Sequence, residues 1–253
     1  MPDESSVSPP LAHIYLDNCR LSNGDWRENV VRAYQAIHEV ETVEDNWHSY
    51  TTERIREFVG SAIHVLRPSV TLEAGCGTFR YAECSHVVPL DFSLGAFRNE
   101  QVGIVGDLLH LPIRDFSFDA VLCVGSVLNL VDAPKAISEL SRVTRIKGAV
   151  ILEYERLGIT CREERNYVEI NSTYAGVAHP LRLYSDRYIE NCLTSANLHV
   201  VKSQYFHALT HVIPPWIGTA RWRVFARAID SLPLPICFRQ KAANRVLLCL
   251  REL

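Results

Sequence analysis

The sequence lacks the features that mark membrane, secreted and metal-binding proteins. None of its apolar runs reaches about 18 residues, so we expect no membrane span. The first ten residues are polar and acidic, without the basic flank and apolar core of a secretory signal. The eight cysteines form no C-x-x-C pair, and the ten histidines lack ligand spacing. We therefore expect buried free thiols, no bound metal and a cytoplasmic location.

An excess of positive charge is also missing. The net charge is −3 at pH 7, which gives no overall attraction to a nucleic-acid backbone. We therefore expect a small-molecule substrate rather than a nucleic acid. A homodimer is the assembly that we consider, and the sequence leaves the oligomeric state open. The hydrophobic fraction of 47% is ordinary for a globular protein with a sizeable core.

Two N-terminal segments show apolar residues at helical spacing. They cover residues 25–41 and 44–66, and Pro68 ends the second because proline cannot continue a helical hydrogen-bond ladder. We predict that residues 1–67 form an N-terminal helical cap.

Beyond Pro68 the pattern changes to short apolar strands that alternate with turns and helices. The strands are predicted at 70–74, 86–90, 101–105, 118–124, 149–154, 198–205 and 245–250, with helices at 132–144, 185–196 and 216–229. Such alternation favours parallel pairing and right-handed crossovers. We predict an α/β, Rossmann-like, doubly wound fold for residues 68–253, with a mostly parallel seven-stranded sheet. Residues 155–183 and 208–243 interrupt the pattern, and we interpret them as insertions around the substrate, the first an irregular lid or loop.

The sharpest motif is the turn at the end of the first predicted strand. The strand ends in Glu73, and the chain then turns through Gly75 and Gly77 into a predicted helix. Glycines allow a tight turn and a close approach of the backbone to a ligand. Amides at the start of a helix can face a polar ligand group. A plain strand-to-helix turn would show the same two glycines, so this motif alone is weak evidence.

Acidic residues at the next two strand ends strengthen this interpretation. Asp91 lies 18 residues after Glu73, where a carboxylate can accept hydrogen bonds from both hydroxyls of a ribose. Asp107 closes the third strand, where a carboxylate can accept from an adenine amine. The carboxyl ends of parallel strands meet at one edge of a sheet, which is where such folds bind ligands. The three acids therefore predict an adenosine-binding site at that edge.

In these motifs the sequence resembles the class I S-adenosylmethionine-dependent methyltransferases. The resemblance covers roughly residues 68–206. It rests on Glu73-Ala-Gly-Cys-Gly-Thr, Leu90-Asp-Phe-Ser, the run 106–121, the run 132–143, Lys147-Gly148 and Tyr184-Ser-Asp186. It implies S-adenosylmethionine as the cofactor and an enzyme that transfers a methyl group to a small-molecule acceptor. It leaves the acceptor, and whether its atom is O, N or C, undefined.

The resemblance also implies a set of site residues. The cofactor-binding candidates are Glu73, Gly75, Cys76, Gly77, Asp91, Phe92, Asp107, Leu108, Cys123 and, from the cap, Tyr50. The catalytic candidates are Asn129, which follows the fourth strand, and Tyr167 and Tyr174, which lie in the segment after the fifth strand. Each of these aromatic residues could equally be a packing residue.

Two residues depart from the family pattern. Phe79 replaces a third glycine of the first motif, and its ring either reshapes the methionine pocket or points into the core. Asn129 stands where the family often has a histidine, and an amide cannot act as a base near neutral pH. NAD binding is disfavoured, because Arg80 occupies the position of the last glycine in the nicotinamide fingerprint. Two alternatives stay open: an enzyme that cyclises or cleaves the cofactor itself and releases methylthioadenosine, and a non-catalytic cofactor-binding module.

Overall fold

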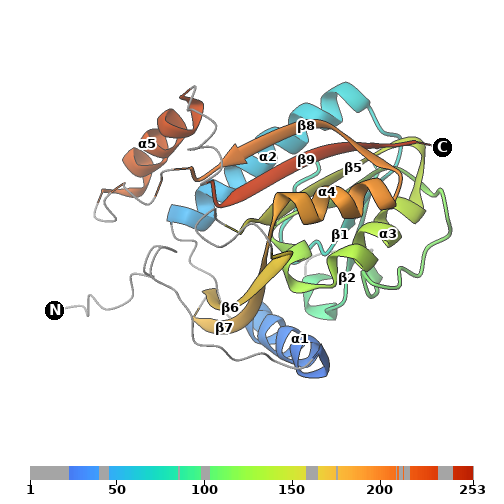
Figure 1. Ribbon diagram of the computed structural model, residues 1–253, viewed down its shortest axis with the longest axis horizontal. Coiled ribbons are helices and arrows are strands. Elements are labelled where there is room, and N and C mark those ends of the chain that lie inside the picture. Colours follow the sequence, from blue (N-terminus) through green and yellow to red (C-terminus); the bar gives the residue numbers. More distant parts are fainter. Residues whose placement is uncertain are drawn as a thin grey trace.

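The computed structural model describes residues 23–39, 46–84, 86–97, 103–157, 165–174, 176–208, 210, 213, 217–232 and 242–252. Figure 1 shows their arrangement. The helices are α1 (Asn23–Glu39), α2 (Asn46–Leu66), α3 (Ala133–Val143), α4 (Asp186–Ser195) and α5 (Thr219–Ser231), with single 3₁₀ turns η2 (Leu94–Phe97) and η3 (Val127–Leu130). The strands are β1 (Thr71–Ala74), β2 (Val87–Asp91), β3 (Ile104–Val105), β4 (Phe118–Cys123), β5 (Thr144–Glu155), β6 (Tyr167–Tyr174), β7 (Val177–Tyr184), β8 (Leu198–Phe206) and β9 (Asn244–Arg251).

Seven of the strands form one sheet in the order β3-β2-β1-β4-β5-β9-β8. Neighbouring strands from β3 through β5 pair in parallel, whereas β9 is antiparallel to both β5 and β8. The prediction of a mostly parallel, seven-stranded, Rossmann-like sheet is confirmed. The order reverses at β1, whose neighbours are β2 on one side and β4 on the other, and ligands bind at such switch points.

Helices cover both faces of this sheet (Figure 1). On one face, Ile137 of α3 and Leu193 of α4 are buried in one apolar cluster, in which α3 contacts β5 and α4 contacts β8. On the other face, α2 buries Ile55 and Phe58. Side chains fix the starts of α3 and α4: Asp132 accepts a hydrogen bond from Lys135 N, and Ser185 accepts one from Tyr188 N. The sheet therefore has an apolar layer on each side, and its polar groups are left to the strand ends.

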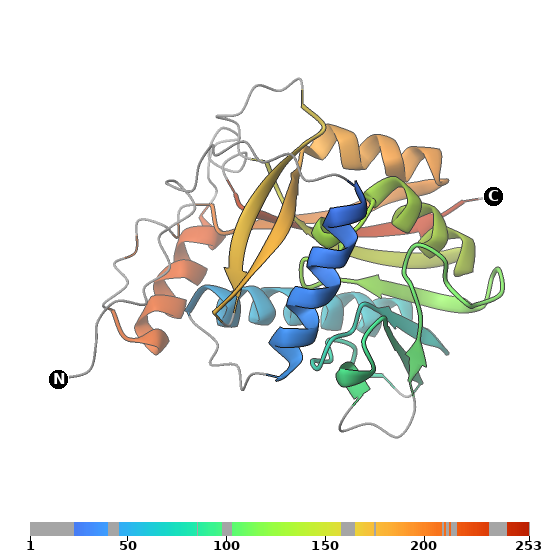
Figure 2. The same ribbon diagram turned by 90° about the horizontal axis from the view of Figure 1, so that it is seen from below.

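The two N-terminal helices have different positions. Whereas α2 packs on the sheet, α1 lies beside the hairpin formed by β6 and β7, as Figure 2 shows. Trp26 and Val30 of α1 bury their side chains with Leu130 and Leu181. The indole Nε1 of Trp26 donates to Leu130 O at 3.1 Å. This contact holds α1 over the carboxyl ends of the strands.

The segment after the fifth strand is more regular than we expected. Residues 155–183 were predicted as an irregular lid or loop, but 167–174 and 177–184 pair as an antiparallel hairpin. The alternation of side chains was hidden because many residues of β6 are polar and partly exposed on both faces. Strand β7 of the hairpin packs on α1 and also contacts η3 and the end of β5, so the hairpin needs only one apolar face.

The predicted helix after the glycine turn is wrong: residues 75–84 and 86 form no helix. The Arg80 guanidinium donates instead to the carbonyls of Cys76, Gly77 and Phe79 at 3.3, 2.9 and 3.0 Å. In a helix, backbone amides would donate to these carbonyls, and here the Arg80 side chain donates to them instead. Glu73 Oε1 accepts from Tyr81 N at 2.7 Å and fixes the far side of the loop.

Two smaller differences concern element bounds. The third strand was predicted at 101–105; residues 101 and 102 lie outside the described ranges, and β3 covers Ile104–Val105. The helix that was predicted at 216–229 begins three residues later, as α5. Within the described ranges, we find no helix with the length and apolar character needed to cross a bilayer.

A buried ion pair joins the end of β5 to the start of α4. Arg156 Nε and Nη2 donate to the two carboxylate oxygens of Asp186 at 2.8 and 2.7 Å, and Tyr154 Oη donates to the same carboxylate at 2.8 Å. Burial alone would raise the pKa of Asp186, but the Arg156 guanidinium holds it below its usual value of 3.8. The folded state therefore favours the ionised form of this carboxyl.

We predict that Asp186→Ala lowers the free energy of unfolding by about 3 kcal/mol, because it leaves a buried guanidinium without its partner. The matched control Asp115→Ala removes an exposed partner of Arg142 and should cost less than about 1 kcal/mol. Because the folded pKa of Asp186 is depressed, its contribution is present above about pH 4 and is lost as the pH falls through the folded value. Denaturant titrations at several pH values measure this, and equal losses in the two variants would contradict it.

Candidate functional site

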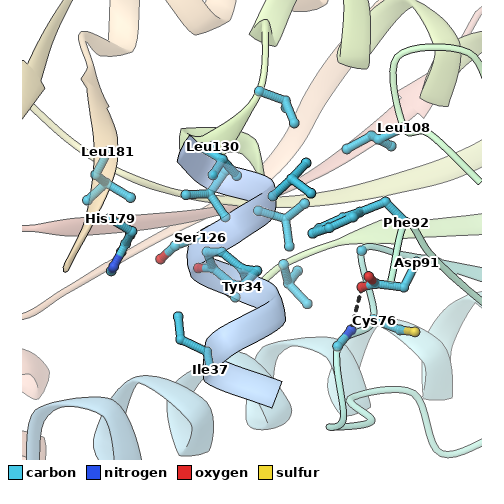
Figure 3. A pocket seen from close by; sticks show the side chains of 18 of the residues that line it. Tyr34, Ile37, Cys76, Asp91, Phe92, Leu108, Ser126, Leu130, His179 and Leu181 are labelled. Atoms are coloured by element: carbon cyan, nitrogen blue, oxygen red, sulfur yellow. Dashed lines mark hydrogen bonds between the residues drawn. The ribbon is translucent and has the colours of Figure 1, made fainter. Parts of the chain in front are cut away.

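A cavity of about 870 Å³ opens at the carboxyl ends of the parallel strands. Its walls come from the turns that follow β1, β2 and β4, from the ends of β3 and β5, and from α1, α2 and the β6–β7 hairpin. In Figure 3, Asp91 and Phe92 lie on one side, His179 and Leu181 lie on the other, and Tyr34 and Ser126 lie between them. We call the first side the glycine-turn end and the second the hairpin end.

The glycine turn forms one wall of the glycine-turn end. Gly75 and Gly77 have φ angles of +73° and +54°, a region that favours glycine. A Cβ on Gly75 would lie 2.5 Å from Val127 Cγ1, so packing excludes a side chain there. A Cβ on Gly77 would meet no atom within 4 Å. The backbone at Gly77 therefore faces open space in the cavity, where a ligand can approach it.

Two carboxylates and one aromatic ring complete this end. Asp91 accepts hydrogen bonds from Gly77 N and Ser93 N, both at 2.9 Å, one on each oxygen. An ionised carboxylate has about four acceptor sites, so two remain for a ligand. Asp107 accepts from Leu109 N at 2.9 Å and from Arg27 Nη2 at 2.5 Å. Phe92 lines the cavity beside Asp91 and is 38% exposed.

The hairpin end gathers titratable side chains from five elements. Glu155 comes from the end of β5, Tyr34 from α1, His48 from α2, and Tyr174 and His179 from the hairpin. The rings of His48 and Tyr174 lie 4.7 Å apart, and those of Tyr34 and His179 lie 5.8 Å apart. Burial raises the pKa of Glu155 and lowers that of His179. This end therefore combines a basic carboxylate with a histidine that favours its neutral form.

Ser126 connects Glu155 to a second buried acid. Its hydroxyl donates to Glu155 Oε1 at 3.0 Å, and its backbone N–H donates to Glu153 Oε2 at 2.7 Å. The other oxygen of Glu153 accepts from Asn244 Nδ2 at 2.7 Å. Burial raises the pKa of Glu153 to about 7 despite these donors. Ser126 has a φ of +60°, which orients both donors toward β5.

Comparison with known proteins finds a family match for the central part of the chain. Residues 72–152 match the family described as "Methyltransferase domain". A demethylmenaquinone methyltransferase of Thermobifida fusca is 31% identical over 128 residues, which cover 45% of this chain and 52% of that protein. A malonyl-[acyl-carrier protein] O-methyltransferase of Yersinia pestis is 33% identical over 93 residues, covering 32% and 35%. The central region of the chain is therefore similar to methyltransferase domains, in agreement with the resemblance to class I S-adenosylmethionine-dependent methyltransferases.

Solved structures show the same fold over most of the chain. The 1,6-didemethyltoxoflavin-N1-methyltransferase of Burkholderia thailandensis superposes with a TM-score of 0.57 at 15% identity, covering 94% of each chain. The [4+2]-cyclase SpnF superposes with a TM-score of 0.52 at 16% identity, covering 78% of this chain and 81% of its own. The chain spans about a third to a half of the curated relatives it matches, and the family match is confined to the central region, whereas the likeness in fold extends over most of the chain.

Most of the site residues implied by the family resemblance lie around the cavity. Its lining includes Gly75, Cys76, Gly77, Asp91, Phe92, Asp107, Leu108 and Tyr174. Their roles toward a cofactor or an acceptor stay predictions. Five other candidates lie outside the lining.

The structure places three of the cofactor-binding candidates away from the cavity. Tyr50 is fully buried and donates its hydroxyl to Asp230 Oδ2 at 3.0 Å, on the opposite side of α2 from His48. Cys123 points into the core, where burial raises the pKa of its thiol to about 12. Glu73 lies beneath the glycine turn, which it fixes through Tyr81 N. These positions give the three residues structural contacts around the site.

Two catalytic candidates also lie outside the cavity lining. Asn129 is fully buried, and its amide group donates to Glu155 O at 2.8 Å and to Arg182 O at 2.5 Å. Its carbonyl oxygen accepts from Glu155 N at 2.8 Å, so the side chain connects β5 to β7. Tyr167 is 39% exposed and packs against Tyr184 on the outer side of the hairpin.

Phe79, which replaces the third glycine of the first motif, lies at the cavity and not in the core. Phe79 lines it, while the Arg56 guanidinium lies 4.1 Å from the ring centroid and the Tyr81 ring contacts its edge. The cation therefore covers the ring from α2, and the ring is held at the cavity wall rather than in the core.

Sequence reasoning missed Glu155 and His179 at the hairpin end. Glu155 carries the signal that identified Asp91 and Asp107, a carboxylate at the end of a parallel strand, but the strand was predicted to end one residue earlier. His48 on α2 lines the cavity, whereas Tyr50, two positions later, lies on another face of the helix. His179 gave no signal, because its position depends on the unpredicted hairpin.

We predict that Glu153 makes stability depend on pH. Its folded pKa of about 7 exceeds its usual 4.5, so its contribution is present below about pH 4.5 and is lost as the pH rises to about 7. Across that interval the free energy of unfolding of the native protein should fall by about 3 kcal/mol relative to Glu153→Gln. The exposed substitution Glu252→Gln is the control. A difference between native protein and Glu153→Gln that does not change with pH would contradict the prediction.

Proposed function

We propose that this protein binds S-adenosylmethionine at the glycine-turn end and transfers its methyl group to a small-molecule acceptor at the hairpin end. The observation that carries this proposal is that one continuous cavity joins the two ends. About 870 Å³ lies in the upper part of the roughly 300–1,000 Å³ that ligand pockets span, and this favours room for a cofactor and an acceptor together.

The residues at the glycine-turn end fit the cofactor. Asp91 has acceptor sites left for the ribose hydroxyls, and we expect Asp107 to accept from the adenine amine. Phe92 offers a ring face beside the adenine, and the open backbone at Gly77 admits the methionine part. The cofactor supplies an electrophilic methyl group on a sulfonium, which needs little further activation.

The remaining work of this chain is to hold the acceptor and exclude water. The helix α1 and the hairpin cover the cavity from the side opposite the sheet. Tyr174 stays our candidate for contact with the reacting groups, because a ring near a sulfonium gains about 0.5–2 kcal/mol from cation–π attraction. The free thiols of the five described cysteines support a reducing compartment, and we propose the cytoplasm.

The volume of the cavity favours methyl transfer over self-reaction of the cofactor. An enzyme that cyclises or cleaves S-adenosylmethionine needs a tight pocket for one ligand, and this cavity extends across to His179 and Leu181. SpnF shows that a cyclase can use this fold, but the likeness extends to the fold alone.

Asp107→Ala should weaken binding of S-adenosylhomocysteine about tenfold or more, because it removes a charged hydrogen-bond acceptor from the glycine-turn end. Asp107 is partly exposed, so the variant should fold normally. Asp115→Ala, on an exposed carboxylate outside the cavity lining, is the matched control and should bind like the native protein. Isothermal calorimetry measures both, and unchanged affinity in Asp107→Ala would count against this placement of the cofactor.

Products formed from the cofactor separate transfer from self-reaction. With S-adenosylmethionine alone, we expect mass spectrometry to detect no enzyme-dependent methylthioadenosine. With a metabolite extract added, we expect S-adenosylhomocysteine and a methylated acceptor in equal amounts. Release of methylthioadenosine without an acceptor would instead support the cyclising or cleaving enzyme.

A further inference from the structure

We propose that the hairpin end is a subsite for a neutral or cationic acceptor with an N–H or O–H group, and that the Glu155 carboxylate receives its proton. This inference rests on the proposed function and deepens it by naming the class of acceptor. It follows from the position of one carboxylate, from the way Ser126 holds it, and from the charges of the surrounding side chains.

Glu155 is positioned to meet a ligand. It lines the cavity at the end of β5, and its backbone is fixed on both sides of the peptide by Asn129, which accepts from Glu155 N and donates to Glu155 O at 2.8 Å each. The Ser126 hydroxyl holds Oε1, and the described residues give Oε2 no hydrogen-bond partner. One oxygen is thus anchored, and the other is available to an acceptor proton.

The cations of the cavity lining do not neutralise Glu155. Arg27 is paired with Asp107, and Lys135 Nζ contacts His110 Nε2 at 2.6 Å at the glycine-turn end. Arg182 lies 3.1 Å from Glu169, and its guanidinium covers the Trp26 ring at 4.2 Å. The arginine and lysine side chains of the lining are thus engaged with other groups, and an ionised Glu155 opposes a carboxylate or phosphate ligand at the hairpin end.

The surroundings of Glu155 shift its pKa in a defined direction. Glu153 on the same strand, Tyr34 on α1 and His48 on α2 act on it electrostatically, and burial is the largest influence on its pKa. Burial raises that pKa, and the Ser126 hydroxyl lowers it. A carboxylate with a raised pKa is a stronger base, which suits it to remove a proton from an acceptor.

The proposed step balances in atoms and charge. The acceptor lone pair forms the bond to the methyl carbon, the carbon–sulfur bond breaks, and its electron pair goes to sulfur. The acceptor proton passes to Glu155, so the positive charge of the sulfonium and the negative charge of the carboxylate disappear together. A protonated amine instead gives its one proton to the carboxylate before the transfer, which frees its lone pair, and the methylated amine then keeps the positive charge that came with the methyl group.

The test is a binding experiment without turnover. The protein is saturated with S-adenosylhomocysteine and titrated with three probes of one size: 4-hydroxybenzylamine, 4-hydroxybenzyl alcohol and 4-hydroxybenzoate. Isothermal calorimetry should show the amine and the alcohol binding at least about tenfold more tightly than the benzoate. In Glu155→Gln, which keeps the shape and removes the charge, the three affinities should agree within about threefold.

Ser126→Gly tests the positioning of Glu155. Glycine suits the φ of +60° and keeps the N–H that binds Glu153, but it removes the hydroxyl from Glu155. The pKa of Glu155 should then rise, so the preference for the amine over the benzoate should appear only at a higher pH than in the native protein. A residue with only a structural role would not shift this pH dependence.

Each result bears on one claim. The inference is overturned if the benzoate binds as tightly as the amine, if Glu155→Gln keeps the native preference, if Ser126→Gly leaves the pH dependence unchanged, or if no probe binds to the loaded protein. Failure of S-adenosylhomocysteine itself to bind would instead reject the proposed function, on which the inference rests.

Discussion

The site depends on the parallel pairing of β1 with its two neighbours. Ala74 is paired with Leu90, Glu73 is paired with Leu122, and the next pair of strands aligns Cys123 with Leu152. Parallel strands that are aligned in this way all end at the same edge, so the residues that follow them must meet there. The glycine turn, Asp91, Ser126 and Glu155 belong to distant parts of the sequence, and this register brings them to one cavity. Without it, none of the hydrogen bonds between these turns could form.

The same constraint explains what could be predicted from sequence. Apolar runs followed by turns located the seven strands of the sheet, and acids at strand ends located Asp91 and Asp107 in the cavity lining. The expectation that an acid at a strand end lies at the site was applied to three strands only, although Glu155 ends β5. Strand ends carry this information because pairing direction, rather than side-chain packing, sets where they lie. A carboxylate at the end of any parallel strand is therefore a candidate site residue.

Residues placed by packing could not be predicted in this way. His48 and Tyr50 are two positions apart on α2, and which of them faces the cavity depends on how the helix is rotated against α5 and the sheet. Asn129 is near the site in sequence, but its amide is used to join two backbone segments. The glycine turn was expected to begin a helix, and Arg80 prevented this by binding the carbonyls that a helix would have used. These outcomes depend on long-range contacts that no local pattern contains.

A single helix spans the two ends of the cavity. Arg27 of α1 binds Asp107 at the glycine-turn end, and Tyr34 of the same helix contacts His179 at the hairpin end. Seven residues of helix rise about 10 Å, so these two contacts are separated by about two turns of one rigid element. Trp26 and Val30 fix that element to Leu130 and the hairpin. The distance between the two ends is thus set by helix geometry, and two ligands that bind together must both fit beneath α1 within it.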